Sequence, residues 1–196
     1  MPILFTNVHT LPSTDVSSSG MPFSVQAPNP GFALVGLAVR AGHWIDQITP
    51  LFAELLEDGS IGPQICGPSF GGYGGNVQEL HLTPGHIVTG IQTRSGNYVD
   101  AVRLLQARWD GTTIDMATAK WTQWIGAPNM GGVERTERMV EPAGGALAVG
   151  IAGRAGHYLD NLTLIGAEPV RVMGTQVARG NNTRASRGSS SSATAG

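Results

Sequence analysis

The stretch GLAVRAGHWIDQITPLFA, Gly36–Ala53, occurs in three related copies along the chain. The second copy is GIQTRSGNYVDAVRLLQA (Gly90–Ala107) and the third is GIAGRAGHYLDNLTLIGA (Gly150–Ala167). They align without gaps, and each has Gly at the first position, Arg at the fifth, Gly at the seventh, Asp at the eleventh and Ala at the last. Chance does not produce such a three-way match. The chain is therefore a threefold internal repeat, with copies 54 and 60 residues apart.

Each copy has the pattern of two strands joined by a turn. The residues before the Arg are rich in small and β-branched types and are bounded by Gly. The residues after the Asp alternate between apolar and polar, as in IDQIT and LDNLTL, which is typical of half-buried strands. The turn then falls on the segment from the second Gly to the Asp: GHWID, GNYVD and GHYLD.

Two further turns are predicted at Asp58-Gly59 and Asp110-Gly111, which follow the first two copies. The stretch LFAELLEDG (Leu51–Gly59) also fits a helix that ends at Gly59. The repeat argues against that helix, because the equivalent LLQARWDG in the second copy has no helical face.

The composition also favours strands. Gly accounts for 28 of 196 residues, and only 13% of residues are charged. The sequence therefore predicts an all-β fold in which three four-stranded units close around a pseudo-threefold axis and leave few free edges.

Several classes of function are excluded. A net charge of −2 without basic clusters argues against nucleic-acid binding. No nucleotide-binding or zinc-protease motif appears, and no metal or other cofactor is expected. The single cysteine, Cys66, is predicted to be a buried structural thiol. The apolar runs are too short for a membrane helix, and the start MPILFTNVHT does not resemble a signal peptide. We therefore expect a cytoplasmic or non-classically released protein without membrane insertion.

The turn carries the groups that a neutral sugar needs. Asp46, Asp100 and Asp160 each supply a carboxylate that accepts hydrogen bonds from adjacent hydroxyls. An aromatic ring two residues earlier can stack on an apolar sugar face. The glycine that opens the turn allows close approach to backbone N–H donors. A carboxylate that only caps its own turn is the alternative for any single copy.

This repeated Gly-x-[Tyr/Trp]-aliphatic-Asp unit, preceded by glycine-rich loops such as GGYGG, resembles the jacalin-related lectins over roughly Ser17 to Pro169. The resemblance implies the β-prism I fold, with three Greek-key four-stranded sheets. It also implies metal-independent binding of mannose- or glucose-type sugars, with galactose as the alternative, and no enzymatic activity. Glycans are then the expected partners, and a homo-oligomer is a further expectation.

The family arrangement pairs each turn with a glycine loop. The first site is expected to be the best formed, because GGYGG keeps both glycine pairs, whereas Glu134 and Arg135 follow the glycines of the second loop and one glycine remains in the third. The residues that the resemblance implies are, in the first site, Gly42, His43, Trp44, Asp46, Gly71, Gly72, Gly74 and Gly75; in the second, Gly96, Asn97, Tyr98, Asp100, Gly131 and Gly132; and in the third, Gly156, His157, Tyr158, Asp160 and Gly20.

Other repeated or aromatic residues have less specific interpretations. Arg40, Arg94 and Arg154 recur and either brace the loops, contact sugar hydroxyls or remain solvated. His43 and His157 are interpreted as polar turn residues, since no second ligand lies at metal spacing. The remaining tryptophans, which are interpreted as core or sheet-packing residues, are Trp109, Trp121 and Trp124.

Two other functions compete with sugar binding. The letters GPSFG (Gly67–Gly71) fit the nucleophile elbow of a serine hydrolase with Ser69 as nucleophile. An elbow must lead into a helix, and the glycines that follow disfavour one. The second alternative is a structural or assembly module with vestigial sugar sites, in which an N-terminal arm pairs with a neighbouring sheet edge. The expected organisation is an arm (1–16), a jacalin-like lectin domain (17–177) and a low-complexity C-terminal tail (178–196).

Overall fold

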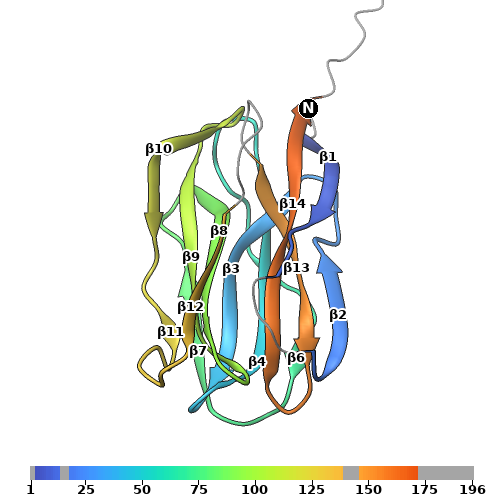
Figure 1. The fold of residues 1–196 in the computed structure, drawn as a ribbon. Coiled ribbons are helices and arrows are strands. Elements are labelled where there is room, and N and C mark those ends of the chain that lie inside the picture. Colours follow the sequence, from blue (N-terminus) through green and yellow to red (C-terminus); the bar gives the residue numbers. More distant parts are fainter. Residues whose placement is uncertain (1–2, 14–17, 139–145, 172–196) are drawn as a thin grey trace, which may run out of the picture.

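The computed structural model describes residues 3–13, 18–138 and 146–171, and within these ranges the chain forms fourteen strands and no helix (Figure 1). The strands are β1 (Ile3–Thr10), β2 (Met21–Gln26), β3 (Phe32–Ala41), β4 (Ile45–Glu54), β5 (Ile65–Cys66), β6 (Phe70–Gly71), β7 (Asn76–His81), β8 (His86–Ser95), β9 (Val99–Trp109), β10 (Ile114–Trp121), β11 (Ile125–Gly126), β12 (Val133–Arg138), β13 (Leu147–Ala155) and β14 (Leu159–Arg171).

The three sequence repeats are the three central hairpins of the fold, β3–β4, β8–β9 and β13–β14. Each hairpin is the middle of a separate antiparallel sheet. The strand orders are β5-β4-β3-β7, β10-β9-β8-β12 and β1-β14-β13-β2, with the short strands β6 and β11 added beside β4 and β9. The predicted four-stranded Greek-key units are therefore present, and in two of them the outer strand is interrupted.

The third sheet joins both ends of the chain. Its central hairpin, β13–β14, is flanked by β1 and β2, so the segment expected to be an arm contributes a strand. Ile3 pairs with Arg171 and Thr10 with Ile165, and the Ile3 side chain is 3% exposed. The arm boundary placed after residue 16 therefore does not separate the first strand from the sheet. The boundary of the expected tail at residue 178 lies outside the described residues.

Equivalent irregularities occur in all three hairpins. The strand register shifts between Leu34 and Gly36 in the first hairpin, between Val88 and Gly90 in the second, and between Ala148 and Gly150 in the third. A Cβ on Gly36 would lie 2.6 Å from the Leu80 carbonyl oxygen, and one on Gly150 would lie 2.2 Å from that of Val25. In the first and third copies, the first glycine of the repeat is thus required for close approach of the edge strand.

The inner faces of the three sheets form the core. One buried cluster combines side chains from every sheet, including Leu37 and Ile48 of the first, Val102 of the second, and Ile151 and Leu164 of the third. The third and first sheets also meet at their edges, where Phe23 of β2 stacks on Phe70 of β6 with ring centroids 4.3 Å apart.

The segment expected to be either strand or helix is the end of β4 followed by a turn. Leu55 forms an isolated antiparallel bridge with Ile61, and Gly59 has a φ of +82°. The Asp58-Gly59 and Asp110-Gly111 turns are confirmed, and Trp109 pairs with Ile114 across the second.

The prediction for Cys66 is wrong: its side chain is exposed. Successive residues of a strand point to opposite faces, and it is the neighbouring Ile65 that packs against the core.

Candidate functional site

The three repeated turns meet at one end of the molecule, where their aromatic rings pack together. The centroid of the Trp44 ring lies 5.3 Å from that of Tyr98 and 5.0 Å from that of Tyr158, and the two tyrosine rings are 4.8 Å apart. These are ordinary edge-to-face and tilted aromatic contacts. The aromatic residue therefore serves first to join the three turns around the pseudo-threefold axis.

All three turns have the same pattern of exposure. The opening Gly and the next residue are exposed, the aromatic residue is half-buried, and the aliphatic residue and the Asp are buried. The exposed second residues are His43, Asn97 and His157. No group of three or more metal-binding side chains occurs among the described residues.

The repeated arginines brace the glycine loops. Arg40 donates from Nε to the carbonyl oxygens of Tyr73 (3.1 Å) and Gly74 (2.9 Å) and from a terminal nitrogen to that of Gly75 (3.0 Å). Arg154 donates in the same way to the carbonyl oxygens of Ser19 and Gly20, each at 2.8 Å. Arg94 donates to the carbonyl oxygen of Pro128 in the second loop. Of the three roles considered for these arginines, loop bracing is the one present.

In the first site, the carboxylate of Asp46 lies directly against the glycine loop. A Cβ on Gly74 would be 2.2 Å from Oδ1 of Asp46, and one on Gly42 would be 3.9 Å from Oδ2. Asp46 is 8% exposed, and within the part of the chain that the structure describes its carboxylate accepts no hydrogen bond. Neither oxygen of this carboxylate is among the fully buried side-chain atoms that lack a partner, so the carboxylate stays accessible and can accept hydrogen bonds from outside the protein.

The turn and the loop of this site each have an unpaired backbone donor. The N–H groups of Trp44 and Gly74 form no hydrogen bond within the described ranges. The loop itself is held in place, because Gly72 donates to the Asp46 carbonyl oxygen (2.8 Å) and Gln47 Nε2 donates to that of Gly72 (3.0 Å). Gln47 was not among the predicted site residues. Its only sequence signal is its place next to Asp46.

The opening glycine of each turn also closes the turn through its backbone. Its N–H donates to the carbonyl oxygen of the aromatic residue two positions later. This bond is 3.0 Å from Gly42 to Trp44, 3.0 Å from Gly96 to Tyr98 and 2.9 Å from Gly156. In the first site the missing side chain matters as well, since a Cβ on Gly42 would fill the space between the Asp46 carboxylate and Gly75.

The second site is more closed. Asp100 is 4% exposed, and a Cβ on Gly132 would lie 2.0 Å from its Oδ2. Burial raises the pKa of Asp100, and this effect is opposed by the hydrogen bond from the Gly132 N–H and by the positive charge of Arg94. Gly131, in contrast, has open space around its Cβ position. The side chains of Glu134 and Arg135, which follow the glycines of this loop, lie outside the described part of the structure.

The third site combines the two ends of the chain. A Cβ on Gly20 would lie 2.3 Å from Oδ2 of Asp160, which is 3% exposed. A Cβ on Gly156 would lie 3.9 Å from the Cα of Gly20, just as a Cβ on Gly42 would lie 3.9 Å from the Cα of Gly75 in the first site. The structure thus places each turn beside the loop that the resemblance assigned to it.

Gly71 and Gly72 have supporting roles. Gly71 has a φ of +112° and pairs with Gln47. Gly72 packs on the backbone of His157 in the third turn, and a Cβ on Gly72 would lie 2.5 Å from the His157 carbonyl oxygen. These two glycines shape the loop, whereas Gly74 and Gly75 face the Asp46 turn.

Of the remaining tryptophans, Trp109 is in the core, at 1% exposure, as predicted. Trp121 and Trp124 are half-exposed and enclose the guanidinium of Arg103, whose central carbon lies 5.0 Å and 4.6 Å from their ring centroids. They pack on the second sheet, as predicted, through a cation–π stack rather than through an apolar core.

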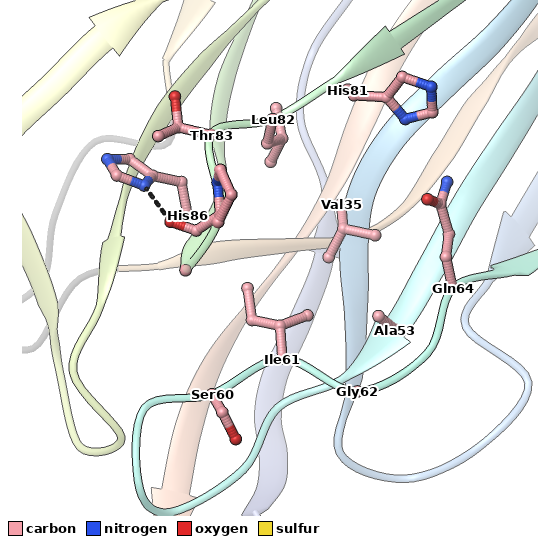
Figure 2. A pocket seen from close by; sticks show the side chains of 12 residues that line it. Val35, Ala53, Ser60, Ile61, Gly62, Gln64, His81, Leu82, Thr83 and His86 are labelled. Carbon is pink, nitrogen blue, oxygen red and sulfur yellow. Dashed lines mark hydrogen bonds between the residues drawn. The ribbon is translucent and has the colours of Figure 1, made fainter.

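The cavities lie elsewhere. One of about 400 Å³ is lined by Val35, Ala53, Ile61 and His86 among others (Figure 2). Val35 and Ala53 are near the end of the β3–β4 hairpin that is opposite the Asp46 turn. A similar cavity of about 410 Å³ lies beside Val149. His86 hydrogen-bonds within its own loop, to the Pro84 carbonyl oxygen at 3.2 Å (Figure 2).

The geometry around Ser69 does not support a hydrolase. Its hydroxyl is exposed and lies 2.6 Å from the hydroxyl of Thr49, which is not a base. Ser69 immediately precedes the two-residue strand β6, and no helix follows in the described chain.

No helix of the described residues is long and apolar enough to span a membrane.

No protein-family model matches the sequence, and no curated protein sequence matches it either. Solved structures do match. The wild-type Malaysian banana lectin aligns with a TM-score of 0.57 and 16% identity over 84% of this chain and 100% of that chain. A mannose-binding jacalin-related lectin from Ananas comosus aligns with a TM-score of 0.58 and 18% identity over 84% and 100%.

Artocarpin in complex with methyl-α-mannose aligns with a TM-score of 0.59 and 13% identity, over 83% of this chain and 99% of that one. These likenesses establish the fold. The β-prism I architecture and the resemblance to the jacalin-related lectins are thereby confirmed.

Proposed function

We propose that this chain, which has the β-prism I fold of the jacalin-related lectins, is a carbohydrate-binding lectin without catalytic activity. The ligand is a neutral sugar of the mannose or glucose type, with galactose as the alternative, and no metal ion takes part. The first site, between the Asp46 turn and the Gly72–Gly75 loop, is the principal one.

The observation that carries this proposal is the state of the Asp46 carboxylate. It is almost buried, yet it accepts no hydrogen bond within the described residues. Two adjacent sugar hydroxyls would supply the missing donors. The unpaired N–H groups of Trp44 and Gly74 would donate to ring or hydroxyl oxygens on either side. A carboxylate flanked by N–H donors complements a neutral diol and needs no cation.

The solved relatives support the choice of sugar. The pineapple protein is described as mannose-binding, and artocarpin was solved with methyl-α-mannose. The aromatic cluster of Trp44, Tyr98 and Tyr158 places all three turns at one end of the molecule, so a branched glycan can reach more than one of them. Shallow single sites bind weakly, and several sites on one face, or a homo-oligomer, would raise avidity.

Calorimetric titration of the full chain with methyl-α-mannoside, methyl-α-glucoside and methyl-β-galactoside in the presence of EDTA tests the proposal. We expect saturable binding of at least one sugar, with loss of the strongest component in Asp46→Asn. Absence of binding for all three sugars, or an unchanged isotherm in Asp46→Asn, would falsify the assignment.

A further inference from the structure

Tyr73 has the most exposed large hydrophobic side chain of the described residues. Its exposed fraction is 88%, although it lies in the middle of the glycine loop of the first site. Its neighbour Gly74 touches the Asp46 carboxylate, and a Cβ there would be 2.2 Å from Oδ1. Consecutive Cα atoms are about 3.8 Å apart, so the Tyr73 side chain starts one residue step from the carboxylate contact.

The backbone that carries this ring is fixed on both sides. Arg40 Nε donates to the Tyr73 carbonyl oxygen at 3.1 Å and to that of Gly74 at 2.9 Å. On the other side, Gly72 donates to the Asp46 carbonyl oxygen at 2.8 Å and packs on the His157 backbone. The ring is thus an exposed aromatic surface on a held loop. A tyrosine has only two side-chain torsions to order when it binds, so little entropy is lost.

The three loops can be compared position by position through the strand register. Gly75, Gly132 and Gly20 each precede the residue that pairs with the end of the central hairpin strand, at Ala41, Ser95 and Ala155 respectively. Counting back two residues, Tyr73 corresponds to Met130 and to Ser18.

All three of these side chains are exposed. In the second and third loops the glycine at the equivalent position, Gly132 or Gly20, lies against the Asp, whereas in the first loop Gly74, one residue before Gly75, does so. The bracing Arg is kept in all three loops, while this outward position changes from an aromatic ring to a thioether to a hydroxyl. What varies is therefore the surface next to a shared pocket, and the first site alone has an aromatic ring there.

We propose that Tyr73 forms a second subsite, which stacks on the apolar face of the sugar residue linked to the one held by Asp46. This inference rests on the proposed function. It names the ligand class of the first site as a disaccharide or longer glycan rather than a single sugar. The apolar C–H face of a pyranose fits a flat aromatic surface, and the exposed phenolic edge remains in water.

The test measures sugar binding at the first site separately from the other two sites, in the full-length protein. Amide resonances of Gly74 and Gly75 in ¹⁵N-labelled full-length protein are titrated with methyl-α-mannoside and with α-linked mannobiose. We expect the wild type to bind the disaccharide about 2- to 10-fold more tightly, the range that one aromatic stacking contact gives. Tyr73→Ala should remove this preference and leave the Kd for the monosaccharide unchanged, and Tyr73→Phe should retain the preference.

Met130→Ala is the matched control, since it alters the equivalent residue of another loop, and it should not change either Kd measured at Gly74. If Tyr73→Ala binds both sugars as the wild type does, or loses affinity for both equally, the second subsite is refuted while the lectin function stands. If neither these mannosides nor the corresponding glucose and galactose mono- and disaccharides shift the Gly74 and Gly75 resonances of the wild type, the lectin function and the subsite both fail. Because Tyr73 is exposed, its substitution should not affect folding, and circular dichroism checks this.

Discussion

The guanidinium of Arg40 holds the carbonyl oxygen of Gly74 at 2.9 Å, across 34 residues of sequence. The same arginine bonds to Tyr73 and Gly75, so one side chain sets the shape of the whole loop. The equivalent Arg154 does the same for Ser19 and Gly20. The distance between the Asp46 carboxylate and its glycine loop therefore depends on a residue that need not touch the ligand.

Replacing Arg40 should weaken the first site without abolishing the fold. Arg40→Ala removes three charge-assisted hydrogen bonds, which should lower the free energy of unfolding by about 1–3 kcal/mol and sugar affinity at Gly74 by about 10-fold. Arg40→Lys should recover part of the affinity, because one ammonium cannot span all three carbonyl groups. Denaturant unfolding and NMR titration measure the two effects. Arg108→Ala, at an exposed position on β9, is the control and should change neither.

A methyl group on Gly74 should block the first site. Its Cβ would lie 2.2 Å from the Asp46 carboxylate, so the loop or the aspartate must move. We expect Gly74→Ala to lose at least about 10-fold in affinity and about 1–3 kcal/mol in stability, the usual cost of overpacking. Gly96→Ala is the matched control, because nothing lies within 4 Å of that Cβ position. Equal binding by the two variants would contradict the geometry of the site.

The pH dependence of stability should carry a contribution from Asp100. Burial raises its pKa in the folded protein, so folding favours the protonated acid. This contribution is fully present below the unfolded pKa of about 3.9, and it is lost as the pH rises through the higher folded pKa. Asp100→Asn should therefore lose less stability than the wild type between acidic and neutral pH. Urea unfolding across this range measures the difference, with the exposed Asp115→Asn as control. A steeper loss in Asp100→Asn than in the wild type would contradict the sign of the shift.

The aromatic cluster should couple the three turns. Trp44 contacts both Tyr98 and Tyr158, and each aromatic pair contributes about 0.5–1.5 kcal/mol beyond simple burial. Trp44→Ala should destabilise the protein by about 1–3 kcal/mol and also shift the amide resonances of Asn97 and His157 in the other two turns. Trp44→Phe should be milder. Shifts confined to the Asp46 turn would show that the turns are independent.

Ser69 should be dispensable. Its hydroxyl is paired with that of Thr49 at 2.6 Å, and a single exposed hydrogen bond contributes about 1 kcal/mol or less. We expect Ser69→Ala to keep sugar binding and nearly all stability, and a fluorophosphonate probe to leave the wild-type serine unmodified. Stoichiometric labelling, detected by mass spectrometry, would restore the hydrolase alternative.

The central hairpins could be predicted because their signal is local. The alternation after each Asp and the Gly that opens each turn lie within eighteen residues, and repetition in three copies separates them from chance. The pairing of Asp46 with Gly74 could be anticipated only through the resemblance to a known family. Nothing in either segment alone indicates the other.

What sequence reasoning missed depends on contacts between distant residues or on the direction of one side chain. The loop-bracing role of Arg40 depends on carbonyl groups some 34 residues away. The hydrogen bond from the Gly42 N–H to Trp44, two residues on, is a detail of turn geometry that composition does not encode. Cys66 was misplaced because a two-residue strand offers no alternation from which to infer its face.

The first strand was missed for a related reason. Its sequence ILFTNVHT loses its alternation where Asn7 adopts a positive φ of 51° and the register with β14 shifts between Thr6 and His9. An irregular edge strand has a pattern that resembles a loose arm. Its partner is at the other end of the chain and provides no local signal.

That the third sheet is built from both ends of the chain has a consequence for folding during synthesis. Arg154 and Gly20, which are hydrogen-bonded in the third site, are 134 residues apart. At translation rates of about 5–20 residues per second, β2 waits roughly 7 to 27 s before β13 exists to pair with it, and β1 waits longer for β14. During that time their edges are unpaired and open to misassociation, and the closing contacts are among the most non-local in the molecule. Closure of the third sheet is thus expected to be the last and slowest step of folding, and a circular permutant that begins just before β13 would remove the delay.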